Sequence, residues 1–122
     1  MRPERLRLIG WLGAVAWGGL IFWLSSTPDA GGVLGFLPTG SDKVLHGVAF
    51  LVLAGLLTVA TGRPVVATAL AVAYGVSDEV HQLFVPGRTA DVADLVADAL
   101  GAAAGAMLVG YLLRREENPT LE

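Results

Sequence analysis

The sequence predicts an all-α integral membrane protein, built as a four-transmembrane-helix bundle. Two observations support this prediction. Hydrophobic residues make up 54% of the 122 residues even without glycine, and charged residues only 16%, against about 25% in typical soluble domains. A small soluble domain has too much surface to hide so many apolar side chains. The apolar residues also gather into runs long enough to cross the roughly 30 Å hydrocarbon core of a bilayer.

We expect one domain, residues 1–122, with four spans. A helix needs about 20 mainly apolar residues to cross a bilayer. The first run is longer than the core of a typical signal peptide and has no clean cleavage site after it, which favours a retained span. The expected spans are residues 6–24, 44–61, 65–83 and 92–113.

The first two spans contain few charges, whereas the last two have acidic residues near one end. Span 6–24 contains Arg7 alone, and His46 is the single titratable residue of span 44–61. The third span follows Pro64, and proline can occupy the first turn of a helix. The acidic residues of the third and fourth spans are Asp78, Glu79, Asp94 and Asp98.

The basic residues predict the orientation of the bundle. Lys43 and Arg88 lie on one side of the expected spans. The basic residues of the other side are Arg2, Arg5, Arg7, Arg63, Arg114 and Arg115. Lysine and arginine are in excess on the cytoplasmic side of membrane proteins. We therefore expect both termini in the cytoplasm (N-in/C-in) and a multi-pass protein of the bacterial cytoplasmic (inner) membrane.

Polar side chains gather at the extracytoplasmic ends of spans 44–61, 65–83 and 92–113. Several are spaced three or four residues apart, so they share a helix face. Ionisable residues inside membranes usually face a bundle interior or a wet cavity. We therefore predict one polar site there, with these candidate ligand-binding residues: Asp42, Lys43, His46, Asp78, Glu79, Gln82, Arg88, Asp91, Asp94 and Asp98.

Three motifs in this region resemble the VanZ-like family. They are Asp42-Lys43-x-x-His46, Asp78-Glu79-x-x-Gln82-x-Phe84-x-Pro86-x-Arg88 and Asp91-x-x-Asp94-x-x-x-Asp98-x-x-Gly101. The resemblance covers about residues 20–113 and implies a small bacterial membrane protein. The founding member of that family is associated with low-level resistance to teicoplanin. Asp98 departs from the family signature, which commonly has Asn at this position.

Composition and spacing argue against several classes of site. The net charge of −3 gives no basic footprint for nucleic acid. Cysteine is absent, which excludes thiolate nucleophiles and Cys-based metal sites. The two histidines, His46 and His81, do not form a closely spaced ligand pair. We therefore expect no metal and no cofactor.

The leading hypothesis is a cell-envelope protein that binds an anionic outer-leaflet lipid, a lipid-linked cell-wall precursor or a glycopeptide-related ligand in a polar cavity. Lys43 and Arg88 would hold anionic groups, because arginine binds phosphate through paired hydrogen bonds. The resemblance adds a contribution to glycopeptide resistance. Membrane lipids are the expected partners, and oligomer formation is left open.

The alternative hypothesis is a membrane-embedded hydrolase or transferase that acts on a lipid-linked substrate. The candidate catalytic residues are His46, Glu79 and Asp94, with the histidine and a carboxylate as acid and base. The sequence leaves open whether any reaction is catalysed. Two further interpretations are a structural role, in which the charges only hold the helices together, and a proton-coupled transporter.

Overall fold

The structure, a computed structural model, describes residues 1–27 and 41–120. Within these ranges the chain forms helices joined by short connections, and the all-α prediction is confirmed there. The helices are α1 (Pro3–Ser26), α3 (Ser41–Thr61), α4 (Pro64–Gln82) and α5 (Val92–Glu117).

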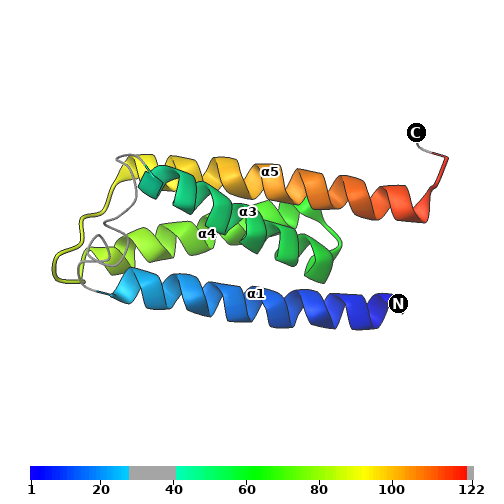
Figure 1. Ribbon diagram of the computed structural model, residues 1–122, viewed down its shortest axis with the longest axis horizontal. Coiled ribbons are helices and arrows are strands. Elements are labelled where there is room, and N and C mark those ends of the chain that lie inside the picture. The colour runs from blue at the N-terminus through cyan, green and yellow to red at the C-terminus, as the bar shows by residue number, and fades with distance from the viewer. Residues whose placement is uncertain (28–40, 121–122) are drawn as a thin grey trace.

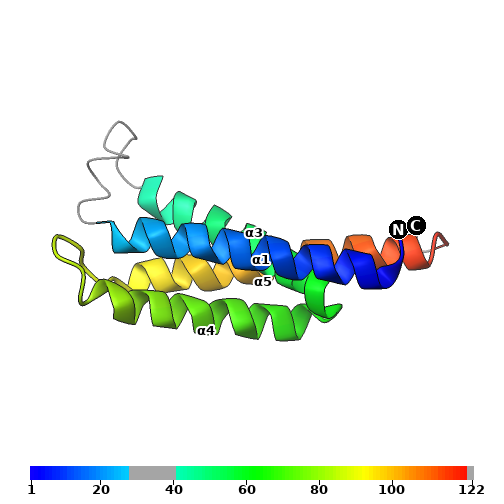
Figure 2. The same cartoon turned by 90° about the horizontal axis from the view of Figure 1, so that it is seen from below.

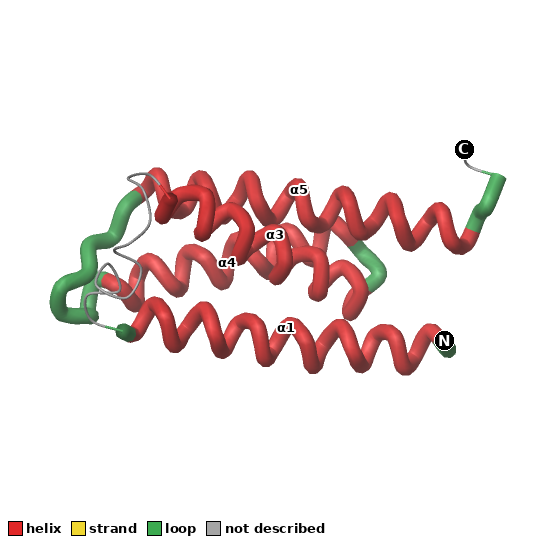
Figure 3. Tube along the Cα trace, viewed as in Figure 1, coloured by secondary structure: helices red, strands yellow, loops and turns green. Residues whose placement is uncertain are grey.

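The described helices alternate in direction and pack as a bundle (Figure 1 and Figure 2). α3 contacts each of the other three described helices, and its contact with α5 is the most extensive. The N-terminal end of α1 and the C-terminal end of α5 lie at the same end of the bundle (Figure 3). The end of α1, the start of α3, the end of α4 and the start of α5 meet at the opposite end, which we call the polar end (Figure 1).

Among the described residues, three helices are long and apolar enough to cross a membrane: α1, α3 and α5. α4 is not one of them, and it contains the buried acids Asp78 and Glu79. All four helices nevertheless expose large apolar side chains, including Val65 and Val80 on α4. Such an apolar outer surface suits lipid, and these features define a membrane protein.

Small residues allow α5 to pack directly against α3. A Cβ added at Gly101 would overlap backbone atoms of Gly47, and one added at Gly105 would overlap those of Leu51. The fully buried alanines Ala54, Ala102 and Ala106 belong to the same buried core. Small residues let membrane helices approach closely, so dispersion contacts stabilise the pair.

Two hydrogen bonds fix α1 against the rest of the bundle. The Trp17 indole Nε1 donates to the Ala49 carbonyl of α3 at 2.8 Å. The Tyr74 hydroxyl of α4 donates to the Gly18 carbonyl of α1. Both side chains bond to backbone carbonyls, which fixes the position of α1 along its neighbours.

Candidate functional site

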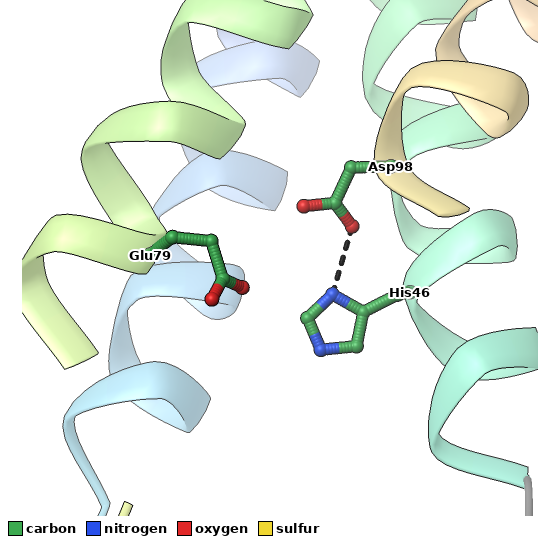
Figure 4. A group of neighbouring side chains, drawn as sticks. All are labelled: His46, Glu79 and Asp98. Carbon is green, nitrogen blue, oxygen red and sulfur yellow. Dashed lines mark hydrogen bonds and ion pairs between the residues drawn. The ribbon is translucent and has the colours of Figure 1, made fainter. Parts of the chain in front are cut away.

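Three side chains from three helices meet near the polar end. His46 of α3, Glu79 of α4 and Asp98 of α5 point toward a common centre (Figure 4). His46 Nδ1 and Asp98 Oδ1 are hydrogen-bonded at 2.8 Å. Each of the three residues offers one possible metal-binding atom, and these atoms lie within 4.8 Å of one another. We call these three residues the central cluster.

The central cluster is largely shielded from solvent. The Asp98 side chain is 0% exposed and the His46 side chain 21%, and Glu79 is buried. Gly75 and Phe50 lie beside Asp98: a Cβ on Gly75 would lie 3.2 Å from both Asp98 Oδ2 and Phe50 Cε1. Low exposure strengthens electrostatic interactions and makes an unpaired carboxylate costly.

Lys43 links α3 to the start of α5 through ion pairs with the carboxylates of Asp91 and Asp94. Its Nζ lies 3.0 Å from Asp42 Oδ2 and 2.8 Å from Asp91 Oδ2, and it also bonds to Asp94 Oδ1. Asp94 additionally places Oδ2 at 3.7 Å from His46 Nε2. Lys43 therefore neutralises a group of acids next to the central cluster.

Asp91 has two structural roles at the start of α5. Its side chain caps the helix by accepting a hydrogen bond from the Ala93 N–H at 2.9 Å, which suits aspartate at this position. Its own N–H donates to Glu79 Oε2 at 3.0 Å. The Lys43 ammonium holds the pKa of the Asp91 carboxyl below its ordinary value, since the positive charge favours the ionised form.

The remaining predicted site residues, Asp78, Gln82 and Arg88, form no hydrogen bond or ion pair with the central cluster. Asp78 and Gln82 are buried on α4. Arg88 Nη2 donates to the Leu24 carbonyl of α1 at 3.0 Å. The structure thus divides the predicted site: Lys43 and its acids adjoin the central cluster, whereas Arg88 contacts the end of α1.

Several buried polar atoms in the described residues have no hydrogen-bond partner. On the central cluster these atoms are Glu79 Oε1 and Asp98 Oδ2, and elsewhere at the polar end they include Arg88 Nε. Buried polar groups are nearly always paired, so each exception needs an explanation. Groups of this kind suit binding of an ion or a polar ligand.

The prediction from sequence omits the last turn of α1, which takes part in the polar end. Ser26 Oγ and His81 Nε2 are hydrogen-bonded at 2.9 Å, and the Phe22 ring stacks on His81 with centroids 4.8 Å apart. No local pattern in the sequence indicates these contacts, because Ser26 and His81 come together only when α1 packs on α4.

The arrangement can support two kinds of chemistry. A carboxylate bonded to one ring nitrogen orients histidine for proton transfer through the other nitrogen. A histidine and two carboxylates also form a donor set for a divalent ion. These alternatives make different use of His46, either as an acid and base or as a ligand.

The helices, their apolar surfaces and the buried polar cluster define a small helical membrane protein. A family model described as VanZ/LLP1 matches residues 10–114, most of the chain. The chain therefore belongs to this family and is a VanZ-like cell-envelope protein, as its three motifs predict. No curated protein and no solved structure matches the chain.

Proposed function

We propose that this protein binds an anionic outer-leaflet lipid or a lipid-linked cell-wall precursor at the polar end. The observation that supports this function best is the Arg88 guanidinium, whose buried Nε has no partner among the described residues. A phosphate oxygen is a suitable acceptor, and charged hydrogen bonds to phosphate are strong. Arg88 lies in the connection between α4 and α5, beside helix ends where such a headgroup would arrive.

The two predicted cationic residues have different roles in this proposal. Lys43 already bonds to three carboxylates: Asp42, Asp91 and Asp94. An anion would have to compete with these acids for its ammonium group. Arg88 uses Nη2 on a neutral carbonyl and has a further donor to offer. We therefore assign the anionic headgroup to Arg88 and a positioning role to Lys43.

Native mass spectrometry of the detergent-purified protein tests this assignment. The probes are phosphatidylglycerol and undecaprenyl phosphate, with phosphatidylcholine as the zwitterionic comparison. We expect Arg88→Gln to lower retention of both anionic lipids about tenfold, since a hydrogen bond to a charged group contributes about 1.5–3 kcal/mol. Arg63→Gln changes an exposed arginine of the α3–α4 connection and is the matched control. Equal retention by the two variants would count against the proposal.

The proposed orientation places the polar end outside the cytoplasm and both termini inside, with all four helices crossing the inner membrane. The absence of native cysteine makes single-cysteine labelling clean. An impermeant maleimide should label Thr89→Cys on intact cells and Asn118→Cys only after lysis. Both positions are exposed, so the reverse pattern would reverse the orientation.

A second candidate function is that of a hydrolase or transferase acting on a lipid-linked substrate. The hydrogen bond between His46 and Asp98 favours it, because this contact orients the imidazole for acid–base work. Purified protein incubated with lipid-linked phosphates and pyrophosphates should release a product that His46→Gln no longer forms. His81→Gln, which changes the other histidine, should retain activity. Activity that survives His46→Gln would exclude this role.

On the basis of the family resemblance, we also propose a contribution to glycopeptide resistance. Expression of the wild-type chain in a susceptible Gram-positive host should raise the teicoplanin concentration needed to stop growth. Arg88→Gln should lose this effect at equal protein level if lipid binding underlies it. Loss of lipid binding with unchanged resistance would separate the two properties.

A further inference from the structure

We propose that the central cluster of His46, Glu79 and Asp98 binds one divalent transition-metal ion, such as Zn²⁺ or Mn²⁺. This site goes beyond lipid binding at Arg88 and does not depend on it. The proposal comes from the placement of three ligand-type side chains together with their bonding and burial.

The geometry brings ligands together from three separate helices. One atom from each of His46, Glu79 and Asp98 lies within 4.8 Å of the others, and the side chains face one another (Figure 4). Zinc–ligand bonds to nitrogen and carboxylate oxygen are about 2.0–2.2 Å long. Small side-chain rotations would therefore close the three atoms around one ion.

The bonding of the two carboxylates supports a cation at their centre. Asp98 is fully buried, and its Oδ2 has no hydrogen-bond donor among the described residues. Glu79 Oε1 also has no hydrogen-bond donor among the described residues. The other carboxylate oxygen of Glu79, Oε2, accepts a hydrogen bond from the Asp91 backbone N–H. Buried carboxylates are stable when they are paired or coordinate a metal.

The neighbouring charges do not meet this need. The Lys43 ammonium bonds to Asp42, Asp91 and Asp94. Within the central cluster, His46 is the basic side chain beside the two carboxylates of Glu79 and Asp98. Its imidazole can supply at most one positive charge. A divalent ion would balance both carboxylates and leave the imidazole neutral, which is the form that binds metals.

The donor set indicates which ions suit the site. Carboxylates alone would favour magnesium or calcium, whereas an imidazole nitrogen favours zinc and related transition metals. Three protein ligands leave a coordination position for water or for an anionic oxygen, as in catalytic zinc sites. Asp94, whose Oδ2 lies 3.7 Å from His46 Nε2, would then help to orient the imidazole ring.

Metal binding by the purified full-length protein tests the site directly. After chelator treatment and dialysis, titration with Zn²⁺ or Mn²⁺ should give about one bound ion per chain. Asp98→Asn and Glu79→Gln should each weaken binding at least about tenfold, the loss typical even of outer-shell changes. Glu4→Gln changes an exposed carboxylate at the opposite end of the bundle and should leave the affinity unchanged.

A spectroscopic readout keeps the test informative where a variant fails to fold. Pulsed electron paramagnetic resonance of wild-type protein with one equivalent of Mn²⁺ should show coupling to an imidazole nitrogen. His46→Gln should remove the coupling, and His81→Gln should retain it. Folded wild-type protein that binds no ion, or binds one without nitrogen coupling, would overturn the proposal. So would equal weakening by Glu4→Gln and Asp98→Asn.

Discussion

The middle of the bundle and its polar end differ in how completely their atoms are packed and paired. Around Gly101 and Gly105, α5 meets α3 through backbone atoms and leaves no space for a Cβ. One turn closer to the end, Asp98 and Glu79 bury oxygens that have no donor among the described residues. Small residues therefore account for the helix contact in the middle, whereas the polar end keeps buried polar atoms without partners among the described residues.

The largest expected effect comes from filling the helix contact. Gly101→Ala should lower the free energy of unfolding by about 3 kcal/mol, the upper end of the range for overpacking, because its Cβ overlaps Gly47 backbone atoms. Unfolding in mixed micelles, followed by circular dichroism, measures the change. Gly19→Ala is the control, since a Cβ there has nothing within 4 Å. Similar losses in both variants would contradict the close-packing interpretation.

The next effect concerns the polar end and follows from the proposed metal site. Zn²⁺ at about 100 times its Kd should raise the free energy of unfolding of the wild type by about 2.7 kcal/mol. Asp98→Asn should lose this stabilisation, because the proposed site uses an oxygen of the fully buried Asp98 as a ligand. Equal stabilisation of both proteins would mean that zinc binds elsewhere.

A smaller effect is expected where α1 joins the bundle. Tyr74→Phe removes the hydrogen bond to the Gly18 carbonyl and should lower the free energy of unfolding by about 0.6 kcal/mol, the average for polar contacts between membrane helices. Tyr111→Phe alters an exposed tyrosine and serves as the comparison. A loss several times larger would show that this bond helps to hold the polar end together.

The smallest effect is expected at the rim of the polar end. Asp42→Asn neutralises one exposed ion-pair partner of Lys43, whereas the hydrogen bonds from Lys43 to Asp91 and Asp94 remain. Exposed ion pairs contribute little because water and salt screen them. Thermal unfolding should therefore be unchanged within error. A marked loss would mean that the rim, as well as the packed middle, stabilises the bundle.

Much of the fold follows from the sequence, since hydropathy and helical period are local properties. They predict an all-helical membrane protein and direct Asp94 and Asp98 toward the bundle interior. The helix ends extend beyond the most apolar residues: α1 starts at Pro3 and α5 continues to Glu117. The crossing of α4 stays a prediction, because among the described helices only α1, α3 and α5 are long and apolar enough to span a membrane.

The candidate site is less predictable, since its members are brought together from distant parts of the chain. The sequence predicts that Lys43 and Arg88 share a role, yet Lys43 bonds to three acids and Arg88 to a carbonyl of α1. It also predicts no metal site, because its two histidines do not form a closely spaced ligand pair one helical turn apart. Here three helices each supply one candidate ligand.

The sequence by itself determined that this is a helical membrane protein of the VanZ-like type and that its charged motifs lie near helix ends. Those properties depend on composition and on the order of motifs along the chain. The tertiary structure decided the pairing of these charges. His46 and Asp98 lie 52 residues apart in sequence, and they meet because Gly101 lets α5 approach α3 closely enough for their side chains to bond.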